Sequence, residues 1–188
     1  MPDLQGESAE QAQSAQELPP PLRVLIPSPI GHLGVELRGT VVTRLIIDPG
    51  KDERSGFKPF HKIEGSDTLD EIFGRLSEYF AGARRRIEID FDLGSCALDT
   101  LSRRVLKETA KIPYGRTRTY QNLAEAVGRP EAYRQVSSIL QENPIPVLIP
   151  CHRVVASKGL GSYVAGAGRK KWLLELESHP DEWDGDPL

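Results

Sequence analysis

The sequence predicts an α+β fold in two parts, a small antiparallel sheet with one helix followed by a mostly helical region. Three observations support this prediction: β-branched runs punctuated by turns in residues 23–48, apolar residues at helical spacing in 66–82, and helical periodicity after Gly94. The length of 188 residues fits one large domain or two small ones at ~100–200 residues per domain. We therefore predict domains at 23–94 and 95–177, with a disordered tail at 1–22 and an acidic tail at 178–188.

The first domain begins with a predicted antiparallel meander over residues 23–48, followed by a polar, irregular stretch from Lys51 to Gly65. Ser66 can cap the next helix, in which apolar residues recur at helical spacing up to Phe80, and Gly82 ends it. The strict alternation of Ile87 to Phe91 predicts a half-buried strand.

The second domain reads as helices. An apolar stripe from Leu98 to Ile112 predicts the first one. Thr119 can cap a second helix that ends near Gly128, and a third helix continues through Leu140, so this pair is typical of a helix-turn-helix. The glycine-rich loop at 159–168 precedes a final helix that carries Trp172.

The charge is unevenly distributed along the chain. The formal net charge is −3, but residues 101–177 carry 13 Lys and Arg against 6 Asp and Glu, whereas the remainder carries 11 against 21. This asymmetry indicates either a surface that faces a polyanion or basic residues on solvated helix faces. The start of the chain lacks the pattern of a secretory signal, and no apolar run is long enough for a membrane span, so we expect a cytoplasmic protein without a membrane partner.

Cys151 is the strongest candidate nucleophile. It follows an apolar run and precedes His152 and Arg153. A cysteine in such a run is by default a small buried hydrophobe. However, basic neighbours would favour the reactive thiolate, and an imidazole can remove the thiol proton. The two cysteines, Cys96 and Cys151, form neither a disulfide framework nor a metal motif, so no metal or cofactor is expected.

The residues around Cys151 resemble the active-site motif of the O6-alkylguanine-DNA alkyltransferases, also called methylated-DNA–protein-cysteine methyltransferases. Further matching segments occur in the family's order and nearly its spacing. The matching segments are 149–155, 112–115, 119–120, Arg134, 143–146, 161–163 and 171–177. The resemblance is strong over residues 101–177 and fainter over 23–93. It implies a ribonuclease H-like first domain and a winged-helix-like second domain.

The resemblance implies a single-turnover reaction in which Cys151 takes the alkyl group from O6-alkylguanine in double-stranded DNA. O4-alkylthymine is a second candidate substrate. His152 would hold the thiolate through a water molecule, and Glu177 would orient His152. Tyr120 would donate to the leaving guanine, while Asn143 would tie the helix-turn-helix to the active-site segment.

The resemblance also assigns residues to the DNA and to the base pocket. Arg134 would fill the space left by a nucleotide flipped out through the minor groove. The further predicted DNA contacts are Tyr120, Thr119, Arg153 and Ser157, and the predicted pocket residues are Tyr163, Val154, Val164 and Ala165. A monomer is expected.

Several residues depart from the family pattern without removing a predicted site residue. Leu101 and Ser102 differ in the first helix, Tyr133 and Gln135 differ on the DNA-facing helix, and Val164-Ala165 could narrow the pocket. Three alternatives stay open: a non-catalytic binder of alkylated DNA, a helix-turn-helix transcriptional regulator and a cysteine hydrolase. The presence of Cys151, the lack of a dimerisation zipper and the poor context of the other histidines argue against them in turn.

Overall fold

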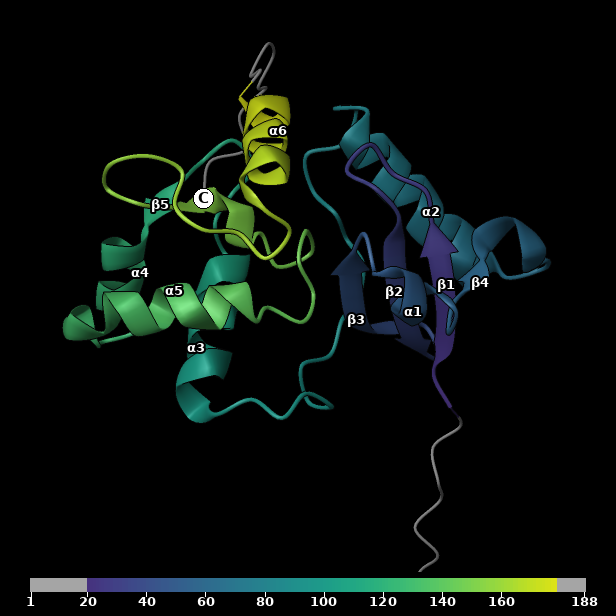
Figure 1. Ribbon diagram of the computed structural model, residues 1–188, viewed down its shortest axis with the longest axis horizontal. Helices are drawn as coiled ribbons and strands as arrows, with labels where there is room; N and C mark the ends of the chain where they lie inside the picture. The colour runs from purple at the N-terminus through teal and green to yellow at the C-terminus, as the bar shows by residue number, and fades with distance from the viewer. Residues whose placement is uncertain (1–19, 179–188) are drawn as a thin grey trace, which may run out of the picture.

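The computed structural model describes residues 20–178, which form two halves that pack side by side (Figure 1). In the amino-terminal half the elements are β1 (Leu22–Ile26), β2 (Leu33–Arg38), β3 (Val41–Ile47), α1 (Lys51–Arg54), β4 (Lys58–Pro59), η1 (Phe60–Lys62) and α2 (Asp67–Phe80). In the carboxy-terminal half they are α3 (Thr100–Ala110), β5 (Arg118–Thr119), α4 (Tyr120–Ala126), η2 (Pro130–Ala132), α5 (Tyr133–Gln141), η3 (Cys151–Arg153), β6 (Val154–Val155) and α6 (Ala167–Glu177). The predicted mixture of α and β structure is therefore confirmed.

The amino-terminal sheet has the strand order β3-β2-β1-β4. β1 pairs antiparallel with β2, and β2 with β3, as the predicted meander requires. The stretch from Lys51 to Gly65 is more ordered than expected, because it holds α1, η1 and β4, and β4 adds to β1 in parallel. Of the predicted tails, residues 20–22 and 178 are described, and Leu22 already belongs to β1; residues 1–19 and 179–188 lie outside the described residues.

Helix α2 follows the sequence prediction closely. The Ser66 hydroxyl accepts a hydrogen bond from the Leu69 amide at 3.4 Å and caps the first turn. The helix ends where Gly82 adopts φ +73°, a left-handed conformation that glycine takes without steric cost. Its buried side chains are Leu69, Ile72, Leu76, Tyr79 and Phe80.

The predicted strand from Ile87 to Phe91 is wrong. The segment is extended and makes only an isolated bridge between Phe91 and Val42. Alternating burial survives, because Ile89 is buried between exposed neighbours. Further along the same edge of β3, the Leu45 amide donates instead to the Pro144 carbonyl of the other half at 2.9 Å. Continued pairing to β3 is therefore replaced by a contact between the two halves.

The predicted helix-turn-helix is present as α4 and α5. The Thr119 hydroxyl caps α4 by accepting from the Asn122 amide at 3.1 Å, and Gly128 turns the chain with φ +71°. Parallel pairing of β5 with β6 places Thr119 opposite Val155. This short sheet brings the start of the helix-turn-helix beside the segment that carries Cys151.

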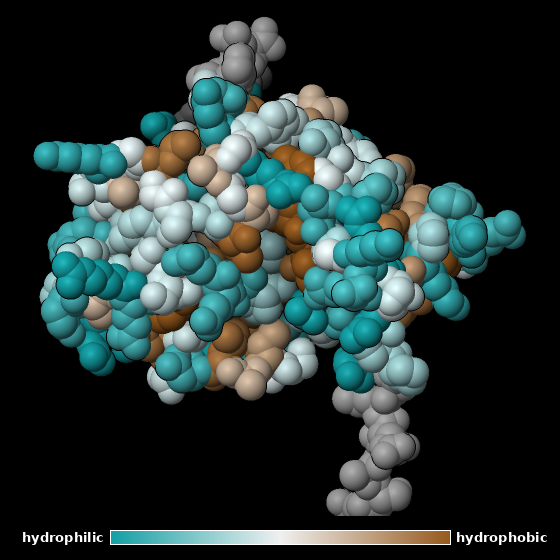
Figure 2. Space-filling view, viewed as in Figure 1, coloured by the Kyte–Doolittle hydropathy of each residue, from teal (hydrophilic) through white to brown (hydrophobic). Residues whose placement is uncertain are grey.

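The two halves meet along an apolar seam. Figure 2 shows hydrophobic residues gathered between the two halves in this view, with polar side chains over both flanks. The Arg169 side chain of α6 crosses the seam and binds the Asp48 carboxylate at 2.6 Å and the Ile30 carbonyl at 2.7 Å. Among residues 20–178, no helix is both long and apolar enough to cross a bilayer.

Candidate active site

Cys151 opens the short helical turn η3 at the end of a buried connector. Val147 and Ile149 are buried ahead of it, and Val147 holds φ +76°, which is unfavourable for a β-branched residue. The Cys151 side chain is itself only 3% exposed. The chain therefore presents this sulfur from within the protein, so a reactant must be inserted to reach it.

Asn143 connects this turn to the end of α5. Its Nδ2 donates to the Ile149 carbonyl at 3.0 Å and to Sγ of Cys151 at 3.1 Å, while its Oδ1 accepts from the Ile145 amide at 3.0 Å. Asn143 is also buried. Asn143 therefore joins the end of α5 to the turn that carries Cys151.

The environment of Cys151 favours the neutral thiol. Burial raises its pKa to about 11, although the hydrogen bond from Asn143 and the charge of Lys170 act in the opposite direction. The effect expected of basic neighbours is therefore smaller than the effect of burial. Arg153 points to Glu177, and burial outweighs the favourable contacts.

Glu177 is the centre of a buried hydrogen-bond network. Its Oε1 lies 3.0 Å from Nε2 of His152 and accepts from the Tyr79 hydroxyl at 2.6 Å. Arg153 donates to both carboxylate oxygens at 2.8 Å, and the Gly115 amide donates to Oε2 at 3.2 Å. Burial alone would raise the pKa of Glu177, but the hydrogen bonds from His152 and Arg153 outweigh it and lower the pKa to about 2.

These contacts fix the tautomer of His152. An ionised Glu177 can only accept hydrogen bonds, so Nε2 of His152 must carry the hydrogen that joins them. Burial lowers the pKa of His152 and favours the neutral ring. Its Nδ1 then has a free lone pair, and this atom is buried without a hydrogen-bond partner among the described residues.

Arg153 does not fit its predicted role as a DNA contact. Its guanidinium is buried, with hydrogen bonds to Glu177 and to the Ile112 carbonyl at 2.6 Å. All of these partners lie inside the protein. Arg153 is therefore a structural partner of Glu177, and burying its charge is favourable only because this pairing compensates for lost hydration.

Tyr120 and Lys170 organise the loop after Cys151. The Tyr120 hydroxyl donates to the Ser162 carbonyl at 3.1 Å, and Nζ of Lys170 donates to the same carbonyl at 2.9 Å and to that of Val154 at 2.6 Å. Gly161 has φ +70°, and a Cβ there would lie 2.7 Å from the Tyr120 ring. Glycine is therefore required for the loop to approach Tyr120.

The predicted pocket residues differ in exposure. Val154 is fully buried, Ala165 is half-buried, and Val164 is 42% exposed. Tyr163 is buried with its ring 6.2 Å from that of His152, and its hydroxyl makes no hydrogen bond within the described residues. Tyr163 is thus brought next to the His152 side of the site, whereas Val164 lies at the surface.

The predicted DNA contacts other than Arg153 remain accessible to different degrees. Arg134 is exposed on α5 and stacks on the Tyr133 ring at 5.5 Å. Ser157 is exposed, Thr119 is half-buried as the cap of α4, and Tyr120 is largely buried. In the region from residue 20 to 178, no cluster of three or more His, Cys, Asp or Glu side chains could hold a metal ion.

Known proteins resemble this chain over most of its length. The family model of the 6-O-methylguanine DNA methyltransferase DNA-binding domain matches residues 100–179. A methylated-DNA–protein-cysteine methyltransferase of Mycobacterium leprae is 39% identical over 155 residues, which cover 81% of this chain and 89% of that protein. The chain belongs to the methylated-DNA–protein-cysteine methyltransferase family.

Other members of this family are similar over most of their length. The methylated-DNA–protein-cysteine methyltransferase of Archaeoglobus fulgidus is 35% identical, with 74% of this chain and 94% of that protein covered. The crystal structure of Mycobacterium tuberculosis O6-methylguanine methyltransferase matches with a TM-score of 0.74 at 33% identity, covering 87% and 96% of the two chains. The Mycobacterium tuberculosis OGT structure in complex with DNA matches with a TM-score of 0.71 at 34% identity, covering 83% and 92%.

Two residues that contact the predicted site, Lys170 and Tyr79, were not predicted from the sequence. Lys170 is fully buried although it lies between Arg169 and Lys171 in the sequence, where a charge run is normally solvated. Tyr79 lies on the apolar face of α2, so the helical periodicity does not indicate its hydrogen bond to Glu177. Neither side chain could have been distinguished from a surface lysine or a core aromatic by sequence pattern.

Proposed function

We infer that this protein repairs alkylated DNA by transferring the alkyl group from O6-alkylguanine to its own Cys151 in a single turnover. The observation that carries this inference is the buried Cys151-His152-Glu177 arrangement, in which Glu177 binds Nε2 of His152 and Nδ1 has no hydrogen-bond partner among the described residues. Family membership supplies the class of reaction, and the arrangement supplies a nucleophile, a base and a group that orients the base.

The proton of Cys151 moves first in the proposed mechanism. Nδ1 of neutral His152 accepts this proton, through one water molecule because adjacent residues cannot readily form a direct pair. Asn143 donates to the sulfur as it becomes negative, and Lys170 adds a favourable charge. Because burial outweighs both contacts and keeps the pKa of Cys151 near 11, the thiolate forms only as His152 takes the proton.

The sulfur then attacks the alkyl carbon in line with the C–O6 bond. A C–S bond forms as the C–O6 bond breaks, and the electron pair of the broken bond stays on guanine. Tyr120, whose hydroxyl is a hydrogen-bond donor in the free protein, donates to the guanine ring as this charge develops. The product is a thioether without a good leaving group, so each molecule reacts once.

The alkylated base must leave the duplex to reach Cys151. A stacked guanine cannot approach the sulfur of a cysteine that is only 3% exposed, so we propose that the nucleotide is flipped into the site. Tyr163 and Val154 would form the inner wall of the pocket, and Val164 and Ala165 would form its rim. The exposed Arg134 on α5 would occupy the gap left in the duplex through the minor groove.

Double-stranded DNA carrying O6-alkylguanine is the proposed partner of a monomer. The excess of basic residues over 101–177 suits the phosphate backbone, and Thr119, Tyr120 and Ser157 are further proposed contacts with the DNA. Ribonuclease H-like and winged-helix-like remain our proposed descriptions of the two halves. These two fold types would account for a sheet domain that lies beside a DNA-binding helix-turn-helix.

Mass spectrometry of the protein after incubation with duplex DNA containing O6-methylguanine tests this function. We expect one methyl group per molecule, on the peptide that holds Cys151, and none in Cys151→Ser. Cys96→Ser is the matched control, because Cys96 lies away from the site and should leave the adduct unchanged. A regulator, a hydrolase or a non-catalytic DNA binder would give no adduct.

A further inference from the structure

We propose that Tyr79 of the amino-terminal half is a positioning residue for alkyl transfer, because its hydroxyl shares a Glu177 oxygen with His152 and thereby keeps His152 a neutral base. This inference rests on the proposed function, since the state of His152 matters to the reaction only if Cys151 must lose a proton. It assigns to the sheet domain a part in the chemistry of the other half.

The contact is direct although it is remote in sequence. The two residues are 98 positions apart, and the Tyr79 hydroxyl donates to Oε1 of Glu177 at 2.6 Å. Oε1 also receives His152 Nε2 at 3.0 Å and Arg153 Nη2 at 2.8 Å. Tyr79 is fully buried, and burial, followed by the charge of Glu177, raises its pKa well above the usual value. Tyr79 therefore remains a neutral hydrogen-bond donor at every pH below its own raised pKa.

Sharing one oxygen makes the two hydrogen bonds interdependent. Each donor to a carboxylate oxygen neutralises part of its negative charge. Without the Tyr79 hydroxyl, more of that charge would act on the imidazole, and a protonated His152 would be stabilised. A protonated His152 cannot accept the proton of Cys151, so the base would be lost at a higher pH than in the native protein.

The charges that face His152 come from several elements. Glu177 on α6 favours the protonated ring, whereas Arg153 on η3 and Lys170 on α6 oppose it. Tyr163 in the loop before α6 and the Cys151 thiol face the ring as neutral groups. Tyr79 donates a hydrogen bond to Glu177, which is the group of this set that favours protonation of His152.

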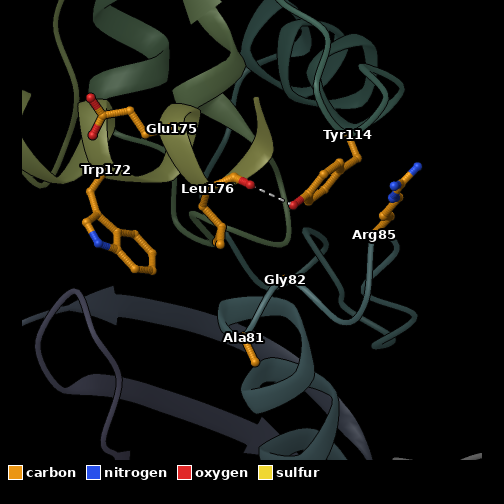
Figure 3. A pocket seen from close by; sticks show the side chains of 7 residues that line it. All are labelled: Ala81, Gly82, Arg85, Tyr114, Trp172, Glu175 and Leu176. Carbon is orange, nitrogen blue, oxygen red and sulfur yellow. Dashed lines mark hydrogen bonds between the residues drawn. The ribbon is translucent and has the colours of Figure 1, made fainter. Parts of the chain in front are cut away.

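Tyr114 provides a matched control in the same part of the seam. Its hydroxyl donates to the Leu176 carbonyl at 3.0 Å, as the dashed line in Figure 3 shows, and within the described residues it makes no hydrogen bond to the Glu177 carboxylate. Its ring packs edge-on against Tyr79 at 6.1 Å. Tyr114 and Leu176 line a cleft of about 410 Å³ between α2 and α6. Phenylalanine at either position removes one hydroxyl and keeps the ring.

The experiment compares Tyr79→Phe, Tyr114→Phe and the native protein. The single-turnover rate of methyl transfer from duplex O6-methylguanine is measured against pH, and His152 is titrated in parallel by ¹⁵N NMR. For Tyr79→Phe we expect the acid limb of the rate and the His152 titration to move up by about half to one pH unit. On that limb the rate should fall about threefold to tenfold, with one adduct per molecule still formed. For Tyr114→Phe neither curve should move.

A site-specific 3-fluorotyrosine at position 79 keeps the hydroxyl and strengthens it as a donor. It should move both curves to lower pH, and it tests the proposal even if Tyr79→Phe fails to fold. The proposal is overturned if the substitutions at 79 change stability alone, or if Tyr114→Phe produces the same shift. Failure of the Tyr79 role can be distinguished from failure of the proposed function. If the native protein forms an adduct but the curves do not move in the position-79 variants, only the role of Tyr79 is rejected. Absence of any adduct rejects the proposed function.

Discussion

The side-chain amide of Asn143 donates a hydrogen bond to the sulfur of Cys151 across 3.1 Å. Asn143 lies just beyond the end of α5, so the second helix of the helix-turn-helix is joined to the nucleophile through one buried side chain. Burial disfavours a negative sulfur, and this bond is the largest of the contacts that oppose the effect. The relationship leads to the first of four predictions.

Asn143→Ala should slow Cys151 chemistry and destabilise the fold. It removes three buried hydrogen bonds, which together contribute about 3 kcal/mol at ~1 kcal/mol each. The pKa of Cys151 should rise further, so iodoacetamide labelling of its peptide between pH 8 and 10 should slow severalfold. Asn122→Ala, which removes one exposed hydrogen bond from the Thr119 hydroxyl at 2.6 Å, is the control for the labelling rate and should destabilise the fold less than Asn143→Ala. Labelling of Asn143→Ala at the native rate would contradict the assigned role.

Acid should unfold this protein through Glu177. Its folded pKa of about 2 lies below the unfolded value of ~4.3, so its stabilisation is present above pH ~4.3 and is lost as the pH falls toward 2. The loss is on the order of 3 kcal/mol, measured as the free energy of urea unfolding against pH.

Two substitutions on α6 separate this effect from general acid unfolding. Glu177→Gln should abolish this part of the acid dependence and cost about 3–5 kcal/mol at pH 7, because Arg153 is left buried without its counter-charge. Glu175→Gln, at an exposed position of the same helix, should leave the acid dependence as it is in the native protein. An unchanged acid transition in Glu177→Gln would refute the prediction.

Lys170→Met should loosen the loop that follows Cys151. The substitution leaves the Val154 and Ser162 carbonyls without the donor that now joins them, at a cost of about 2 kcal/mol. We expect methyl transfer to slow by about tenfold, or ~1.4 kcal/mol, and limited proteolysis to accelerate between residues 156 and 166. The adjacent, exposed Lys171→Met is the matched control. Equal effects of the two substitutions would show that Lys170 has no special role.

Arg134→Ala should impair repair in duplex DNA far more than reaction with the free modified base. Flipping a nucleotide costs a few kcal/mol, and an inserted side chain recovers part of it, so we expect a loss of about tenfold or more in duplex. Arg129→Ala removes another exposed arginine of this region, one paired with Glu131 at 2.9 Å, and should weaken binding without this selectivity. Single-turnover rates with both substrates provide the test, and equal losses would reject insertion by Arg134.

Local rules explain the elements that the sequence predicted correctly. The caps at Ser66 and Thr119 and the turns at Gly82 and Gly128 depend on bonds within four residues, so they can be read from neighbouring letters. The strand at 87–91 failed because a strand also needs a partner edge. Alternation predicts which side chains are buried, but part of the β3 edge is hydrogen-bonded to the Pro144 carbonyl instead.

The sequence by itself determined the helical and sheet regions and the helix-turn-helix, because periodicity and capping are properties of the chain. Its resemblance to a known family supplied Cys151, His152, Asn143 and Glu177 as a candidate set. Only the tertiary structure decided that Arg153 turns inward, that Lys170 is buried and that Tyr79 reaches Glu177 from the other half. Each of these outcomes depends on which distant group compensates a polar side chain for its lost hydration. For Arg153 and Lys170 the compensating groups lie in the carboxy-terminal half itself, whereas for Tyr79 the compensation exists only once the two halves have packed together.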